Sequence, residues 1–399
     1  MNAPGIQVPS ERLWSRALVA VLCAQFLSAM ADNALLFAAL ALLKRDHFPD
    51  WTAPLLQEFF VVAFILLAPF AGPFADSRPK GRVMLISNAV KLLGAAGMLA
   101  GLNPFFAYGL AGVGAAAYSP AKYGILSELT TPAQLVRANG LMESSTIAAI
   151  LLGAVAGGVL ADWSVAATLV IIVICYGAAA AANLLIPYIA PEKPTTSRAV
   201  VPLIRSFFQA SRQLAGIREA RFAVIGTSVF WGAGATMRFL LVAWVPVALG
   251  ITTNRMPAYL NGAIAVGIVL GAALAARFIT VEKAVRALPA GVLIGAAVCL
   301  MGGTHGVGMA FALMAVVGTC GGFYVVPLNA LLQERGHETV GAGNAIAFQN
   351  FWENCLILVM IGLYTLAVHA GVSVAATPLI FGLGLSAAIA VLWWCWLRT

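Results

Sequence analysis

Long apolar segments separated by short polar loops run along the whole chain. Twelve of these segments are long enough to cross the hydrocarbon core of a bilayer as helices. They predict transmembrane helices at residues 14–43, 54–75, 82–101, 105–126, 138–161, 165–188, 222–249, 257–277, 287–303, 307–331, 343–368 and 372–397. The pattern therefore predicts an all-α polytopic membrane protein whose two ends lie on the same side.

The longest polar connection divides the predicted helices into two groups of six. It covers residues 189–221 and separates an N-terminal bundle, residues 1–188, from a C-terminal bundle, residues 222–399. Its second half, residues 202–221, interleaves apolar side chains with arginines. That pattern favours a basic amphipathic helix on the cytoplasmic leaflet. A positive anchor that only fixes topology is the alternative.

Composition and charge agree with this interpretation. Apolar residues make up 61% of the chain and charged residues 10%, far below the roughly 25% of a soluble domain. The net charge of +8 would suggest nucleic-acid binding in a soluble protein. Here 18 of the 23 basic residues fall in, or within about one turn of, alternate loops and the termini. The positive-inside rule therefore explains the positive charge and predicts cytoplasmic termini.

Cofactor and metal signatures are missing from the sequence. All six cysteines lie inside apolar segments without a Cys-x-x-Cys pair, the four histidines lie in or near predicted loops, and there is no P-loop. We therefore expect no cofactor, no metal and no enzymatic activity. The first 31 residues also resemble a secretory signal peptide, but the apolar run continues past Asp32 to Leu43, which favours a retained first helix.

Two opposite charges lie near the middle of predicted spans. Asp32 belongs to the span at residues 14–43 and Arg238 to the span at 222–249. An isolated charge at this depth costs at least ~2.5–3.5 kcal/mol, so such residues usually pair, line a polar cavity or bind a polar ligand. We hypothesise that Asp32 and Arg238 pair or nearly pair between the two halves. A static structural pair is the alternative to one that breaks during function.

The offset of 206 residues between Asp32 and Arg238 recurs elsewhere. Gly112, Tyr118 and Glu128 return 206 residues later as Gly318, Tyr324 and Glu334, and Asn139 returns after 205 residues as Asn344. Parallel repeats around a central site are a transporter architecture. Further polar residues in the predicted spans are candidates for lining that site. With Asp32 and Arg238, the substrate-binding or gating candidates are Gln25, Asn33, Lys91, Tyr118, Lys122, Asn139, Glu143, Asn350 and Glu353.

The loop after the second span carries a recognisable motif. Gly72, Asp76, Arg78, Lys80 and Arg82 resemble the cytoplasmic signature of the major facilitator superfamily. The resemblance implies two pseudo-symmetric six-helix bundles that alternate access. It also implies that the aspartate lies near a helix N-terminus, where the helix dipole favours its charge, and that the basic residues help to latch the outward-open state.

Longer segments of the sequence resemble one particular family within this superfamily. Residues 24–29, 32–37, 115–126 and 138–153 resemble the bacterial lysophospholipid transporter family. The resemblance implies movement of lysophosphatidylethanolamine and lysophosphatidylglycerol from the outer to the inner leaflet of the bacterial inner membrane. It also implies a cytoplasmic acyltransferase/acyl-carrier-protein synthetase as the functional partner that reacylates them. We expect the acyl tail to enter laterally between helices, and no nucleic-acid partner.

Other functions fit less well. A proton-coupled drug or small-molecule exporter of the same superfamily is the main alternative, but the glycine-rich part of the fifth span, Gly153–Gly158, lacks the Gly-Pro pair usual in such exporters. A membrane-bound acyltransferase would need a His/Asp pair, and His47 and Asp50 have the wrong spacing. A scaffold without transport would leave the charges within the spans unexplained.

Overall fold

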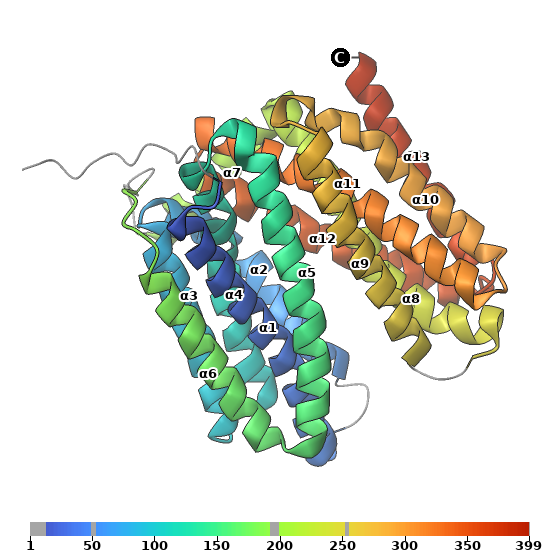
Figure 1. Cartoon of the computed structure of the whole chain (residues 1–399), viewed down its shortest axis with the longest axis horizontal. Helices are drawn as coiled ribbons and strands as arrows, with labels where there is room; N and C mark the ends of the chain where they lie inside the picture. The colour runs from blue at the N-terminus through green and yellow to red at the C-terminus, as the bar shows by residue number, and fades with distance from the viewer. Residues whose placement is uncertain (1–12, 49–52, 192–198, 252–254, 399) are drawn as a thin grey trace, which may run out of the picture. The chain divides into compact units, whose positions relative to one another are not determined.

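A computed structural model describes residues 13–48, 53–191, 199–251 and 255–398, and every regular element in this part is helical (Figure 1). Three predictions fall partly outside the described residues. The first is the placement of the N-terminus. The second is the His47/Asp50 pair, because Asp50 lies outside the described residues, and the third is the first half of the linker, because residues 192–198 lie outside them.

The described helices follow the predicted spans in order. In the first half of the chain they are α1 (Arg16–Arg45), α2 (Ala53–Asp76), α3 (Lys80–Leu99), α4 (Pro104–Leu129), α5 (Pro132–Trp163), α6 (Val165–Leu184) and α7 (Val200–Gly216). In the second half they are α8 (Arg218–Leu249), α9 (Arg255–Phe278), the 3₁₀ helix η2 (Val281–Ala287), α10 (Leu288–Gly302), α11 (Val307–Glu338), α12 (Ala342–His369) and α13 (Thr377–Arg398).

Eleven of the described helices are long and apolar enough to cross a membrane, so the chain is a multi-pass membrane protein. The helix α4, which corresponds to the predicted span at 105–126, has the length but is less apolar. Tyr118, Ser119, Pro120 and Lys122 interrupt its apolar run. The remaining helix, α7, covers Val200–Gly216 and overlaps residues 202–221, where the sequence favours an amphipathic helix.

Helix ends follow local capping more closely than the apolar pattern does. The Ser15 side chain accepts a hydrogen bond from the backbone N–H of Leu18 and starts α1. Pro132, in the first turn, starts α5 six residues before the predicted span. Apolar patterns mark only the part of a helix at membrane depth, so polar helical extensions were missed.

The described chain forms two compact units. Unit 1 comprises Met1–Ala138, Ser145–Gly216 and Gln333–Phe351, and unit 2 comprises Asn139–Ser144, Ile217–Leu332 and Trp352–Thr399. Each unit therefore takes segments from both sides of the linker. The predicted bundles, residues 1–188 and 222–399, remain a prediction about chain organisation.

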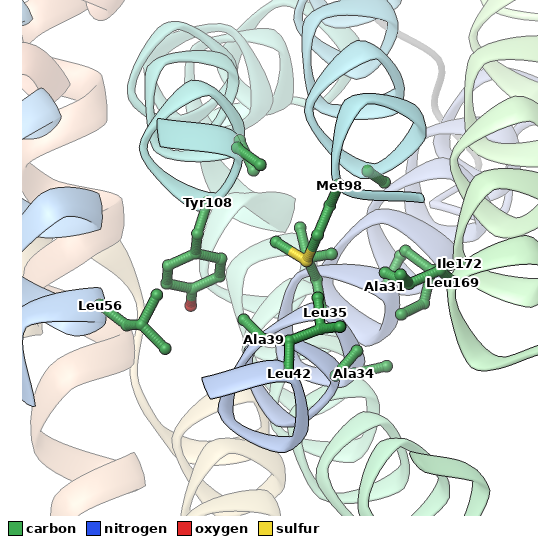
Figure 2. Close-up of a cluster of buried hydrophobic side chains, with 14 of the residues drawn as sticks. Ala31, Ala34, Leu35, Ala39, Leu42, Leu56, Met98, Tyr108, Leu169 and Ile172 are labelled. Carbon is green, nitrogen blue, oxygen red and sulfur yellow. The ribbon is translucent and has the colours of Figure 1, made fainter. Parts of the chain in front are cut away.

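The core of unit 1 gathers side chains from five helices. Figure 2 shows Leu35 and Leu42 of α1 beside Met98 of α3, with Tyr108 of α4 and Leu56 of α2 on one side. Leu169 and Ile172 of α6 close the cluster on the other side. Tyr176 belongs to the same cluster. This apolar layer fixes α1, α3 and α6 around the polar residues described next.

Candidate functional site

The predicted site residue Asp32 lies in a hydrogen-bonded polar cluster within unit 1. One carboxylate oxygen, Oδ2, accepts a hydrogen bond from the ammonium Nζ of Lys91 on α3, at 2.7 Å. The other, Oδ1, accepts one from the hydroxyl of Tyr176 on α6, also at 2.7 Å. The Lys91 side chain is 2% exposed and that of Asp32 is 18% exposed. Asp32 and Lys91 therefore form an ion pair, and neither charge is isolated within its helix.

The Lys91 ammonium extends the cluster along α1 and α3. It donates a second hydrogen bond to the hydroxyl oxygen of Ser28, at 3.0 Å, and this hydroxyl donates to Oδ1 of Asn88, at 2.7 Å. The ammonium also lies 4.9 Å from the ring centroid of Tyr118, close enough for a cation–π contact. The buried lysine thus has oxygen acceptors on one side and an aromatic face on another.

Helix α5 packs closely against the same part of α1. The Gln25 amide donates to the hydroxyl oxygen of Thr146, at 3.0 Å. A Cβ added at Gly157 would lie 2.6 Å from Cα of Ala34, and one added at Gly153 would meet the backbone of Met30. The glycines therefore bring the two backbones together beside Asp32. By contrast, the Asn33 amide only donates to the backbone of its own helix, at Ala29.

Other predicted site residues lie in unit 2. The carboxylate of Glu143, itself 1% exposed, accepts a hydrogen bond from the amide of Asn329 on α11, at 3.2 Å. Asn139, one turn before Glu143, is also fully buried. Glu353 on α12 is buried, whereas Arg238 on α8 has an exposed side chain. The proposed pairing of Arg238 with Asp32 joins different units and stays a prediction.

Two further candidates, Lys122 and Asn350, also lie in unit 1. Lys122 is buried, and its ammonium lies 4.1 Å from the ring centroid of Tyr123. Asn350 on α12 donates to the hydroxyl of Ser119 on α4, at 2.9 Å. The substrate-binding or gating role of Lys122 stays a prediction.

The motif residue Asp76 caps the N-terminus of α12 within unit 1. Its carboxylate accepts hydrogen bonds from the backbone N–H groups of Gly343 and Asn344, at 2.8 and 3.0 Å. It also accepts one from the Asn344 side-chain amide, at 2.8 Å. Backbone N–H groups in the first turn of a helix have no acceptor within the helix itself, so the Asp76 carboxylate supplies one. The helix dipole also favours a negative charge at this end.

The other motif residues surround this cap. The buried Lys80 ammonium forms an ion pair with Glu128 at the end of α4 and lies 3.8 Å from Asp76. A Cβ at Gly72 would lie 2.7 Å from Cα of Asn344, so glycine permits the contact between α2 and α12. Arg78 and Arg82 are exposed and lie over the rings of Phe74 and Tyr188.

Several residues that complete these contacts were not among the predicted site residues. They include Asn88, Ser119, Tyr176 and Asn329, which are hydrogen-bonded to Ser28, Asn350, Asp32 and Glu143 respectively. A signal existed for Asn88, which lies one turn before Lys91 and therefore on the same helix face. Tyr176 had a weaker signal as a single hydroxyl in an aliphatic segment. The remaining two needed the fold, since each partner is distant in sequence.

The cluster holds charges of both signs without the residues of a metal site. Across the described ranges, no group of three His, Cys, Asp or Glu side chains is placed to hold a metal ion. An ammonium and a carboxylate side by side can instead bind a ligand that carries both a cation and an anion.

Comparison with known proteins gives a consistent result. The sequence model described as Major Facilitator Superfamily matches residues 21–376. A protein named lysophospholipid transporter LplT from Klebsiella pneumoniae is 58% identical over 381 residues, covering 96% of each chain. One with the same name from Escherichia coli O1:K1 is 57% identical over the same share.

Solved structures agree on the fold. The fucose transporter FucP, in an outward conformation, matches with a TM-score of 0.75 at 16% identity, covering 96% of this chain and 99% of its own. The human organic anion transporter MFSD10 matches with a TM-score of 0.76 at 16% identity, covering 95% and 98%. At this identity the match concerns the fold alone, and it confirms the predicted fold class.

Proposed function

Since the chain belongs to the lysophospholipid transporter family of the major facilitator superfamily, we propose that it carries lysophospholipids across a bacterial inner membrane. The observation that carries this proposal is the 58% identity over 96% of the chain to a named lysophospholipid transporter. The relatives are named transporters, which supports transport rather than an enzymatic reaction.

The direction proposed is from the outer to the inner leaflet, by alternating access. Lysophosphatidylethanolamine and lysophosphatidylglycerol are the proposed substrates, and a cytoplasmic acyltransferase/acyl-carrier-protein synthetase is the proposed partner that reacylates them. We place both termini in the cytoplasm, because the basic residues concentrate in the loops on that side. The acyl tail would enter laterally between helices and remain in contact with lipid.

The polar cluster supports head-group binding by ion-pair exchange. Opening the Asp32–Lys91 pair without compensation would leave two charges unsatisfied inside the membrane, which is costly. A phosphoethanolamine head group carries both charges: its phosphate would accept from Lys91 and its ammonium would donate to Asp32. From the sequence, Arg238 is the proposed second cation for the phosphate, because a charge at its depth in a span needs a polar partner.

The cap at α12 supports a second role for the motif residues. Asp76 holds the N-terminus of α12 through three hydrogen bonds and has Lys80 nearby. We expect this contact to favour one of the alternating states and to break in the other. Gly72 keeps the helices close enough to form it.

The test is leaflet movement of labelled lysophosphatidylethanolamine in spheroplasts that lack the endogenous transporter. The label starts in the outer leaflet, and wild type is compared with Asp32→Ala, Arg238→Ala and Asp162→Ala. Asp162 is an exposed carboxylate on α5 and serves as the matched control. We expect fast inward movement in wild type and in the control, and its loss in the other two variants.

A second strain separates transport from reacylation. In cells that lack the acyltransferase, the label should still reach the inner leaflet but should remain a lysophospholipid. No inward movement in a well-expressed wild type would overturn the proposed substrate class. If the labelled lysophospholipid became phospholipid in cells without the acyltransferase, the protein itself would have enzymatic activity. Its assignment as a transporter without enzymatic activity would then be overturned.

A further inference from the structure

The linker helix α7 has two apolar faces, and unit 1 covers only one of them. Phe207, Ser211 and Leu214 are buried. The ring of Phe207 lies edge-on to that of Phe351 on α12, with centroids 5.8 Å apart, and α7 also contacts α2. Figure 1 shows α7 near the end of unit 1 at which α1 begins. This buried face fixes the orientation of α7.

The second apolar face is exposed. Val201, Ile204 and Phe208 follow an i, i+3, i+7 spacing and form one stripe, and they are 75%, 36% and 59% exposed. With about 3.6 residues per turn, this stripe lies next to the buried face. Apolar side chains in such a stripe can enter the boundary between head groups and acyl chains.

Arginines border the exposed stripe on its other side. Arg205 follows Ile204 directly and Arg212 lies two turns further along the same edge, and both are exposed. The segment 200–216 contains no acidic residue that would neutralise them. A helix with an apolar stripe and an arginine edge matches a surface whose outer layer is negative and whose interior is apolar.

We propose that α7 is an anchor for anionic phospholipids. Val201, Ile204 and Phe208 would insert below the head groups of the adjacent leaflet, while Arg205 and Arg212 bind lipid phosphates. The contact between Phe207 and Phe351 places this anchor against the part of α12 that follows its Asp76 cap. The inference concerns a surface outside the polar cluster and does not depend on which substrate is carried.

The experiment is hydrogen–deuterium exchange of the full-length protein in nanodiscs. One set contains phosphatidylcholine alone, and in the other part of it is replaced by phosphatidylglycerol. We expect peptides from residues 199–217 to exchange more slowly with the anionic lipid. Each arginine should contribute about fivefold to binding, so the difference should be lost in Arg205→Gln/Arg212→Gln.

Two further variants complete the test. Ile204→Ser/Phe208→Ser should also lose the protection, because insertion of the stripe is removed. Arg286→Gln changes an exposed arginine on η2 and should leave α7 exchange unchanged. Unaltered exchange in peptides around Phe351 would show that unit 1 is intact in each variant.

Several outcomes would overturn the proposal. Equal α7 exchange of wild type in both lipids would do so, as would lipid dependence that survives the double arginine substitution. Protection that appears only after a purified cytoplasmic acyltransferase is added would assign the surface to a protein partner instead. None of these readouts measures transport, so they are independent of the proposed substrate.

Discussion

Asp32 on α1 is bonded through its carboxylate to the ammonium of Lys91 on α3, at 2.7 Å, and Lys91 is almost fully buried. Removing one partner of a buried ion pair leaves the other charge uncompensated, which costs about 3–5 kcal/mol in fully buried cases. Asp32 is partly exposed, so the effect here should lie toward the lower end of that range.

We therefore predict that Lys91→Met lowers the unfolding temperature in detergent, and that Asp32→Asn/Lys91→Met recovers most of the loss. Thermal unfolding followed by intrinsic fluorescence measures both. Arg45→Met is the matched control, because its ion pair with Asp46 is exposed and should contribute little to stability. A double variant no more stable than Lys91→Met would contradict the pairing.

Tyr176 contributes a hydrogen bond to the same carboxylate. Tyr176→Phe removes the hydroxyl and keeps the ring in the apolar core, so we expect a loss of about 1–3 kcal/mol from the poorly satisfied Asp32 oxygen. The control is Tyr188→Phe, since the Tyr188 side chain is exposed. In the Asp32→Asn background the effect of Tyr176→Phe should shrink, and equal effects in both backgrounds would show that the hydroxyl does not act through Asp32.

Asp76 should control how firmly the N-terminus of α12 is held. Asp76→Asn retains one oxygen acceptor but removes the charge and presents an amide donor to backbone N–H groups. We predict slower transport and faster hydrogen exchange at Gly343 and Asn344. Asp46→Asn, in an exposed pair with Arg45, provides the control. Unchanged exchange at α12 in Asp76→Asn would show that the Asp76 carboxylate does not control how firmly this helix end is held.

The sequence was sufficient for the order of the helices and for the motif, but not for most pairings. Depth in an apolar segment identified Asp32 as a costly charge, because a charge at that depth needs compensation whatever the fold, and Lys91 was one of the further polar candidates in the spans. It did not identify Lys91 as the partner of Asp32, since the two are 59 residues apart and only the packing of α1 and α3 brings them together.

The repeat suggested Arg238 as a partner of Asp32, a pairing that joins different units and stays a prediction. Symmetry relates equivalent positions along two helices, but it does not determine the rotation of either helix about its axis. In the described structure, the residues bonded to the Asp32 carboxylate are Lys91 and Tyr176, both from unit 1. Asn329 was missed for a similar reason: its partner Glu143 belongs to a short segment of α5 assigned to unit 2.

Neighbouring glycines on α5 give a test of close packing beside the polar cluster. A Cβ at Gly157 would lie 2.6 Å from Cα of Ala34 on α1, so Gly157→Ala must force the two backbones apart. A Cβ at Gly158 would meet only the ring of Phe37, at 3.8 Å, which is ordinary contact. Gly158→Ala is thus a control on the same helix turn.

We predict that Gly157→Ala lowers stability by about 1–3 kcal/mol through overpacking. It should also slow transport, because separating α1 from α5 displaces Asp32. Gly158→Ala should change both quantities little, and alanine's higher helix propensity offsets part of any loss. Thermal unfolding and lysophospholipid movement, measured on both variants at matched expression, provide the comparison. Equal behaviour of the two variants would mean that the approach of α5 to α1 is not constrained at Gly157.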